Sequence, residues 1–592
     1  MPLQLEVGLK QVDVQSLIQQ IEDGEIVLPD FQRDFVWPTH QVGKLLESIL
    51  NGYYINTLLS LPVVTGETTE SPFPPRQVDG APTQGVDPFS MQMILDGQQR
   101  ISSIYYAVTA PEIPLANTKY AQLFCLDWEK VLAGDLDEDA ISWRRWNWKS
   151  SQRLIDNDLA FQIKKGLIPF TIFKSKDIFK DWRRGMEALA ESRADLSKDD
   201  VDLFEDNTEV FRSYKIPVIQ LNADTPEDKV VQTFERINTQ GLELGVFDIL
   251  TARLWTRDIR LRDLWEDIID DEDYPRLATC SDMIGETRLR ELMLKTLALH
   301  RGGECKDRNL RQLAPESFAE DWENTAGMMD RMLEKAVSPQ AGGLGVSRKF
   351  GFPYTALIPT LANMIHHAET NGSFPDGEAL KKVYKWYWIS VFSARYSGSS
   401  DTKLYQDMKQ LTSWLNGGDP PNSISEGLNR IPVELDLKSV YRGGKYRAVM
   451  SLLLLAGARD FGTLESISLH KADDHHIFPA SQLKKGINGK KYEDRTARDN
   501  VLNRTVIEAK VNRFKYRDQL PGEYVPQMIE EHTDGKQGVK RLLKEHLINE
   551  AGFKAMLEND YEAFLSARKA AIQQEIEDRV GESFDWSEGN GL

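Results

Sequence analysis

The sequence predicts a multidomain α+β protein, and three observations support this class. A chain of 592 residues is too long for one hydrophobic core. Residues 12–108 alternate short helical and extended patterns, whereas residues 260–415 follow a helical pattern almost throughout. We therefore expect an α+β domain over residues 1–255, a mainly helical coupling region over 256–418 and a C-terminal, largely helical domain over 419–592.

The N-terminal domain is expected to alternate helices and strands. The predicted elements, in order, are a helix over 12–24, a strand over 25–28, a helix over 39–50, strands over 55–64 and 91–95, and a helix over 98–108. Five prolines in residues 65–90 predict a loop between the two later strands.

Helices dominate the expectation for the rest of the chain. The predicted helices lie over 170–192, 227–236, 245–257, 287–299, 379–394 and 446–458. In the fifth of these, we expect the stripe Trp386, Tyr387, Trp388 and Phe392 to be core. Gly417-Gly418-Asp419-Pro420-Pro421 is the best candidate for an interdomain linker.

The composition is that of an ordinary soluble protein, with 41% hydrophobic and 28% charged residues. No apolar run is long enough for a membrane helix, and residues 1–10 do not resemble a secretion signal. Cys125, Cys280 and Cys305 are far apart and odd in number, which argues against a disulfide framework and for a reducing compartment. We expect a cytoplasmic protein with no membrane partner.

The charge of the chain is unevenly distributed. The formal net charge is −19, yet residues 484–517 contain eleven Lys and Arg against four Asp and Glu, a local charge of +7. Such a basic island suits contact with DNA over a restricted surface, although a solvated basic face is the alternative interpretation. The candidate DNA contacts in the island are Lys484, Lys485, Lys490 and Lys491.

The order His475-His476, then Asn503, then Asn512 suits metal-dependent hydrolysis of a phosphodiester. Such an enzyme needs a base to activate water, a cation to neutralise the phosphate, and a group that holds the base in its reactive tautomer. Imidazole suits the first role, and oxygen ligands with imidazole suit Mg²⁺ or Mn²⁺. Asn503 could fill the third role. Alternatively, the histidines are ordinary polar residues near the end of a strand.

These residues resemble the HNH superfamily, whose ββα-metal motif places His-Ile-x-Pro on a strand, an Asn in the following loop and an Asn or His on a helix. The matching elements here are 475–479, Asn503 and Asn512. The resemblance implies that His476 is the general base and that Asn503 orients it. Asn500 competes with Asn503 for this role.

The resemblance also implies that His475 (or Asp474) and Asn512 bind the metal ion. His475 stands where many family members have Asp, so both ligands remain open.

Two polar clusters interrupt apolar segments of the N-terminal domain, at residues 28–37 and 94–100. In the second, Gly97 at a strand-to-helix turn would let main-chain N–H groups approach an anion. Arg33 and Arg100 could bind phosphate, and Asp96 could hold a cation. The alternative is a tight turn stabilised by an arginine salt bridge, because the chain has no P-loop.

Three sequence elements together resemble the N-terminal domain of GmrSD-type restriction enzymes. In chain order, they are Phe31-Gln32-Arg33, Asp96-Gly97-Gln98-Gln99-Arg100 and residues 234–241. The resemblance implies a fold similar to ParB and sulfiredoxin that binds and hydrolyses a nucleoside triphosphate, whose base is left open. The implied nucleotide-binding residues are Gln32, Arg33, Asp96, Gly97, Gln98, Gln99, Arg100, Arg236 and Asn238.

The whole layout resembles type IV, modification-dependent restriction endonucleases of the GmrSD and BrxU kinds. It implies cleavage of double-stranded phage DNA carrying hydroxymethylated or glucosylated cytosine, by a protein that often forms a homodimer. One alternative is a phosphorothioate-sensing nicking enzyme of the SspE kind, which shares the layout. Another is a nucleotide-operated DNA-binding regulator with a vestigial nuclease domain.

Residues 142–149 interleave aromatic and basic side chains, a pattern that suits phosphate contact combined with stacking. The candidate DNA contacts are Arg144, Arg145, Trp146 and Lys149. We favour the alternative, a helix with its tryptophans in the core and its arginines in solvent.

Overall fold

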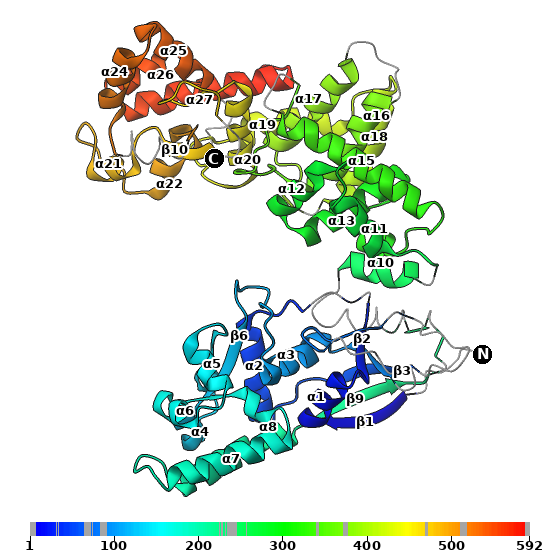
Figure 1. Cartoon of the computed structure of the whole chain (residues 1–592). Coiled ribbons are helices and arrows are strands. Elements are labelled where there is room, and N and C mark those ends of the chain that lie inside the picture. Colours follow the sequence, from blue (N-terminus) through cyan, green and yellow to red (C-terminus); the bar gives the residue numbers. More distant parts are fainter. Residues whose placement is uncertain are drawn as a thin grey trace. The chain divides into compact units, whose positions relative to one another are not determined.

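The computed structural model divides the chain into two compact units, residues 1–258 and 259–592 (Figure 1). The first boundary lies close to the predicted one at residue 255. The structure describes residues 7–30, 32, 35–63, 73, 75–82, 91–223, 225–226, 229–230, 233, 245–255, 257–338, 342–370, 377–398, 400–467, 472–508 and 518–586.

Unit 1 is built on a six-stranded mixed sheet. The strands, in spatial order, are β1 (Val7–Asp13), β9 (Lys215–Leu221), β3 (Leu58–Val63), β5 (Met91–Asp96), β2 (Ile26–Pro29) and β4 (Pro75–Arg76). The pairs β2–β5 and β3–β9 are parallel, and the others are antiparallel.

Helices cover both faces of this sheet. On one face, the core is formed with α1 (Val14–Glu22), α2 (Thr39–Leu50) and α3 (Gln98–Thr109). Alternate strand residues on the other face, including Leu59 and Met93, form a separate core cluster with Ala252 of α10 (Val246–Trp255). The predicted helix over 39–50 and the predicted strand over 91–95 therefore both form in unit 1.

A second, three-stranded sheet has the order β7 (Ile141–Arg145), β6 (Gln122–Asp127) and β8 (Leu167–Pro169). The prediction of a helix over 142–149 was wrong, because residues 141–145 pair in antiparallel register with β6. The predicted helix over 170–192 consists of a short 3₁₀ helix and α7. The remaining elements of the unit are α4 (Trp128–Ala133), η1 (Glu138–Ala140), α5 (Lys149–Ile155), α6 (Leu159–Lys165), η2 (Phe170–Phe173), α7 (Lys176–Ala190) and α8 (Lys198–Ser213).

Unit 2 is helical apart from one hairpin, of β10 (Ala472–His476) and β11 (Arg504–Glu508), within its described residues. Its first helices are α11 (Leu261–Ile269), α12 (Pro275–Ile284), α13 (Glu286–His300), α14 (Asp307–Leu310), α15 (Phe318–Val337), η3 (Thr355–Leu357), α16 (Ile358–Thr370), α17 (Glu378–Phe392) and α18 (Asp401–Leu415). Those that follow are α19 (Asn422–Glu434), α20 (Gly443–Leu455), α21 (Ala480–Lys485), α22 (Arg495–Asp499), η5 (Val501–Asn503), α24 (Pro521–Glu531), α25 (Gly535–Glu545), α26 (Glu550–Leu557) and α27 (Tyr561–Val580).

The predicted linker at residues 417–421 is a short turn between α18 and α19. Gly417 has a φ of 93°, a conformation that favours glycine. Helix α17 contacts α19, α20 and α27, so the helical middle and the C-terminal region form one compact unit. The predicted core stripe of α17 is confirmed, since Trp386, Tyr387, Trp388 and Phe392 are all buried.

None of the helices that the structure describes has the length and apolar character required to span a membrane.

Candidate active site

The His-Ile-Phe-Pro element follows directly from strand β10. In the hairpin, His475 lies opposite Thr505 and His476 lies opposite Arg504. Because successive side chains of a strand point to opposite faces, Asp474 and His476 share one face and His475 lies on the other.

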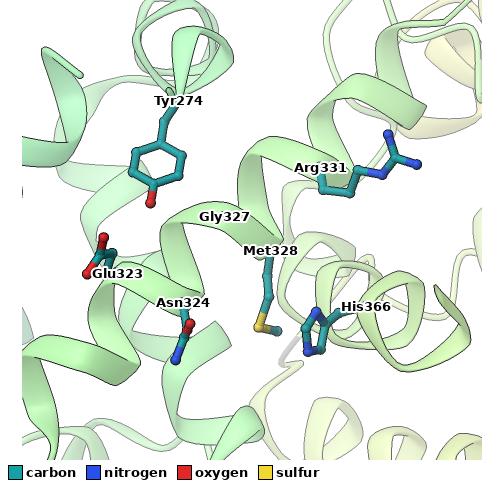
Figure 2. Close-up of a pocket in the computed structure, with 7 residues that line it drawn as sticks. All are labelled: Tyr274, Glu323, Asn324, Gly327, Met328, Arg331 and His366. Atoms are coloured by element: carbon teal, nitrogen blue, oxygen red, sulfur yellow. The ribbon is translucent and has the colours of Figure 1, made fainter. Parts of the chain in front are cut away.

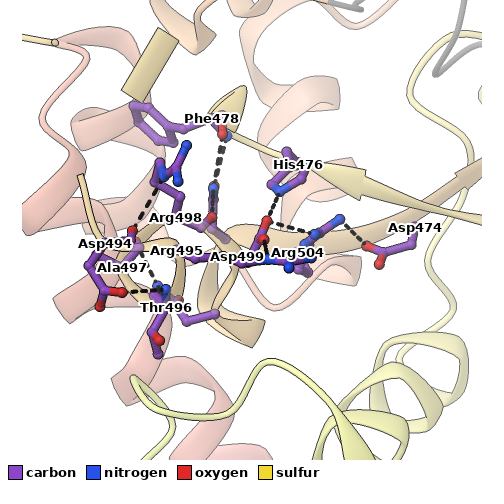
Figure 3. A network of polar contacts seen from close by, with 12 residues as sticks. Asp474, His476, Phe478, Asp494, Arg495, Thr496, Ala497, Arg498, Asp499 and Arg504 are labelled. Carbon is purple, nitrogen blue, oxygen red and sulfur yellow. Dashed lines mark hydrogen bonds and ion pairs between the residues drawn. The ribbon is translucent and has the colours of Figure 1, made fainter. Parts of the chain in front are cut away.

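His476 is held by a carboxylate from the connecting segment. Its Nε2 lies 2.7 Å from Oδ1 of Asp499, the last residue of α22 (Figure 3). Burial would raise the pKa of Asp499, but its hydrogen bonds with His476 and Arg495 and the charge of Arg504 lower it below the usual value. An ionised Asp499 accepts the Nε2 proton, so the imidazole carries its lone pair on Nδ1.

Arg504 links this pair to a second carboxylate. Its guanidinium lies 3.0 Å from Asp499 and 3.1 Å from Asp474 (Figure 3). The Tyr446 hydroxyl also donates to Asp474. Burial and the charge of Arg504 lower the pKa of His476, although Asp499 opposes this shift. The lowered pKa favours the neutral imidazole that general-base catalysis requires.

The Asn503 side chain hydrogen-bonds to the main chain just after the end of β10. It accepts a hydrogen bond from the Phe478 N–H at 2.8 Å and donates to the Phe478 carbonyl at 2.9 Å. It also donates to the Arg498 carbonyl, which ties the strand end to the segment that carries Asp499. Asn503 thus acts on the main chain, while Asp499 contacts the imidazole ring. The amide nitrogen of Asn500 donates to the carbonyls of Thr496 and Ala497.

His475 lies in the interior and is only 3% exposed. Its ring packs edge-on against Phe461, which also packs against the buried His546. Burial lowers the pKa of His546 to about 3, so this second imidazole is neutral. The two alternative metal ligands, Asp474 and His475, therefore lie on opposite faces of the hairpin.

A complete metal site is not found in the described part of the chain. No group of three or more His, Cys, Asp or Glu residues there could hold an ion. The third predicted ligand, Asn512, belongs to residues 509–517, which lie outside the described residues. The carboxylate and imidazole donors present are of the types that Mg²⁺ or Mn²⁺ accepts.

The four candidate lysines of the basic island lie at the surface. Lys484 and Lys485 end α21, and Lys490 and Lys491 follow a tight turn. Lys490 pairs with Glu562 at 2.6 Å. Lys484, Lys485 and Lys491 form no ion pair with a residue that the structure describes, and phosphate contact by these lysines stays a prediction.

The second motif forms the predicted strand-to-helix turn between β5 and α3. Gly97 has a φ of 100°, and a Cβ at this position would lie 2.2 Å from a Leu58 methyl group. Only glycine fits here without rearrangement.

The motif side chains around this turn bond mainly to the main chain. Arg100 donates to the carbonyls of Ile55 and Thr57 and pairs with Asp96 at 2.9 Å. The amide nitrogen of Gln32 donates to the carbonyls of Ile94 and Leu95.

The two glutamines of the turn are also buried. Gln99 accepts hydrogen bonds from the N–H groups of Val36 and Trp37. These contacts stabilise the turn by themselves, so the predicted phosphate contacts stay predictions. Three other predicted nucleotide-binding residues lie outside the described residues: Arg33, Arg236 and Asn238.

Strand β7 forms an edge of the smaller sheet and carries part of the aromatic and basic cluster. Arg145 lies over the rings of Tyr120 and Trp148, with 4.6 and 5.6 Å to their centroids. Trp146 is half-buried and donates to the Ala110 carbonyl, whereas Trp148 is 48% exposed. Of the other candidates, Arg144 is half-buried and Lys149 is exposed. Because Arg145 and Trp148 are exposed, they are accessible to DNA, and DNA contact at this edge stays a prediction.

A cavity of about 290 Å³ lies in the helical region of unit 2, between α12, α15 and α16 (Figure 2). Arg331 at its edge is engaged by Glu369, with two contacts of 2.9 Å. Burial lowers the pKa of His366, another lining residue. No predicted site residue falls on this cavity, and we assign it no ligand.

Sequence reasoning missed the roles of Asp499 and Arg504. Both residues lie close to Asn503 in the sequence. A search for acidic and basic residues between the His-Ile-Phe-Pro element and Asn512 would have found them.

The first unit resembles a known protein family. Residues 14–255 match the family model of the GmrSD restriction endonuclease N-terminal domain. The match indicates a restriction-endonuclease type of function, and hence a nuclease that binds DNA. The chain is also 29% identical to the uncharacterized protein MJ0686 of Methanocaldococcus jannaschii, over 97% of this chain and 99% of that protein. The relative therefore shares the layout of both units without adding a described activity.

Proposed function

We propose that this protein is a metal-dependent HNH-type endonuclease that cleaves modified phage DNA as a type IV restriction enzyme. One observation carries the proposal: the imidazole of His476 is oriented by Asp499 at 2.7 Å, on a hairpin in the same chain as a restriction-endonuclease N-terminal domain. A base of this kind, beside a basic surface, suits hydrolysis of a DNA phosphodiester.

In the proposed mechanism, Nδ1 of His476 accepts a proton from the attacking water. The water oxygen forms a new bond to phosphorus while one phosphorus–oxygen bond of the DNA backbone breaks. The departing sugar oxygen keeps the electron pair of that bond and takes a proton from solvent water. Asp499 stabilises the imidazolium that forms, while burial and the charge of Arg504 lower the pKa of His476 and favour the neutral imidazole before the reaction. The Asn503 hydrogen bonds keep the strand end and the Asp499 segment together.

A Mg²⁺ or Mn²⁺ ion, when bound, would neutralise charge on the scissile phosphate. Asn512 and either Asp474 or His475 would hold it. To distinguish the two alternative ligands, the rate of DNA cleavage is measured at increasing metal concentration for the Asp474→Ala and His475→Ala variants. Substitution of the residue that binds the metal should raise the metal concentration needed for half-maximal cleavage. Substitution of the other residue should leave that concentration near the wild-type value.

We further propose that the N-terminal domain has a ParB/sulfiredoxin-like fold and binds and hydrolyses a nucleoside triphosphate at the turn around Gly97. The positive φ of Gly97 and the N-terminus of α3 support an anion site there. A homodimer would supply one active site for each strand, which makes it a convenient arrangement for a double-strand cut, and light scattering tests for the dimer.

The decisive experiment compares unmodified, glucosylated and phosphorothioated plasmid DNA, with and without each nucleoside triphosphate. We expect metal-dependent linearisation of glucosylated DNA, which excess EDTA stops. Nicked circles from phosphorothioated DNA would instead indicate the nicking alternative. If no substrate is cut in the presence of metal, the proposal is wrong and the regulator with a vestigial nuclease is favoured.

A further inference from the structure

A cavity of about 380 Å³ lies on the main sheet of unit 1, beside α1. Its floor comes from β2, β3, β5 and β9, and its walls come from β1 and the exposed side of α1. The lining includes Ser60, Gln92, Leu58, Ile94, Ile26 and Glu25. No residue of the Asp-Gly-Gln-Gln-Arg turn lines it, so it is distinct from the predicted phosphate site.

Polar side chains interrupt an otherwise apolar face of the sheet at this cavity. Ser60 and Gln220 are partners in the register of β3 and β9. Gln220 donates from Nε2 to Oε1 of Gln92 at 3.0 Å. With its oxygen used in this bond, Gln92 offers its amide nitrogen as a donor.

Ser60 gives independent evidence for a ligand. Its side chain is 1% exposed, and its hydroxyl has no hydrogen-bond partner within the part of the chain that the structure describes. A buried hydroxyl without a partner is costly, and such groups are uncommon in folded proteins. A molecule in the cavity would supply the missing partner.

The charges and the floor of the cavity define the ligand class. Lys10 is outnumbered by Asp13 and Glu25, so the lining disfavours a phosphate group. Leu58 and Ile94, on adjacent strands of the floor, supply apolar side chains that could pack against the face of a planar ring. Amide and hydroxyl groups suit the donor and acceptor pattern along the edge of a nucleobase.

We propose that this cavity binds an uncharged nucleobase, with Ser60 and Gln92 contacting its polar edge. The base belongs either to a free nucleoside or to an unpaired nucleotide of DNA. The proposal stands apart from the nuclease site, because loss of cleavage in a His476 variant would leave base binding unchanged.

The test is equilibrium binding of adenosine, guanosine, cytidine and thymidine to the full chain in EDTA, measured by calorimetry. We expect at least one nucleoside to bind, and Ser60→Ala to weaken it about fivefold to tenfold, as expected for one lost hydrogen bond. Thermal unfolding separates this effect from a folding defect, because removing an unpartnered hydroxyl should leave the Tm unchanged or raise it.

Ser151→Ala is the matched control. Ser151 is also fully buried with an unpartnered hydroxyl among the described residues, but it lies in α5 and does not line the cavity. Its substitution should leave nucleoside affinity unchanged. No nucleoside binding, equal affinity in the Ser60→Ala and wild-type proteins, or binding of glucose in place of nucleosides would each overturn the proposal.

Competition distinguishes the two sources of the base. A DNA duplex with one unpaired base is added to the bound nucleoside, and a fully paired duplex of the same length is the comparison. Displacement by the first duplex alone assigns the cavity to a DNA base. Displacement by neither duplex assigns it to a free nucleoside, and both outcomes support a nucleobase site.

Discussion

In the hairpin of unit 2, the ionisable side chains bond to one another, whereas in the Gly97 turn of unit 1 the motif side chains bond mainly to the main chain. His476, Asp499, Arg504 and Asp474 form a connected chain of side-chain contacts. Arg100, by contrast, donates to two carbonyls in addition to its pair with Asp96.

This difference has a physical consequence. A network of ionisable groups shifts the pKa of its members, as it does for His476 and Asp499. Hydrogen bonds to carbonyls instead fix the position of a loop and add to stability. Acidic, basic and histidine side chains are therefore stronger evidence for a catalytic site in the hairpin than in the turn.

The largest expected effect is the loss of DNA cleavage in His476→Ala. Removing a general base lowers the rate about 10²–10⁴-fold. The side chain is only partly buried, so the Tm and the turnover of nucleoside triphosphate should change little. Cleavage at the wild-type rate would show that the base lies elsewhere. The hairpin of unit 2 would then have no stronger claim to a catalytic role than the Gly97 turn of unit 1.

Asp499→Asn should lower the cleavage rate about 10–100-fold, as is typical when the group that orients a histidine is removed. The amide cannot stabilise the imidazolium as a carboxylate does. Asp494→Asn is the control, since Asp494 is exposed and caps α22 through the N–H of Thr496. Similar rates for the two variants would mean that the Asp499 contact is only structural.

Arg100→Ala tests the other region. Loss of hydrogen bonds from a charged donor should destabilise unit 1 by about 1.5–3 kcal/mol. If Arg100 also binds phosphate, nucleoside triphosphate turnover falls at temperatures where the variant is still folded. Denaturant unfolding and turnover are measured on one preparation, with Arg100→Lys as the comparison. Unchanged stability would contradict the structural role assigned to this turn.

Arg504→Gln should produce the smallest change, a shift in the pH dependence of cleavage. Only neutral His476 can act as the base, so the rate falls as the pH drops through its pKa. Because the charge of Arg504 helps to lower that pKa, its removal should move the acidic limb of the profile to higher pH.

The control for this shift is Arg495→Gln. Arg495 also pairs with Asp499, at 3.0 Å, but its side chain is largely exposed. Its substitution should leave the acidic limb near its wild-type position. An equal shift in both variants would show that Asp499, and not the proximity of Arg504 to the imidazole, controls the profile.

Local pattern was sufficient for several elements. The helix predicted over 39–50 is α2, and the apolar stripe of α17 is buried as expected. These predictions succeeded because helical periodicity reports burial within a few turns of the same segment.

Strand pairing depends on distant residues and could not be predicted in the same way. Strand β1 was missed because it pairs with β9, and the ion pair of Asp13 with Lys215 joins residues 202 positions apart. Strand β7 was assigned to a helix because its aromatic and basic pattern does not reveal its pairing with β6.

The sequence by itself determined the candidate base, His476, the asparagine that clamps its strand, and the glycine that the turn requires, because each is marked by residue type and spacing. Only the tertiary structure showed that Asp499 contacts the imidazole of His476, and that burial and the charge of Arg504 lower its pKa. It also showed that Arg100 is engaged by main-chain carbonyls. Contacts of this kind depend on how the segments fold together in space, which local pattern does not encode.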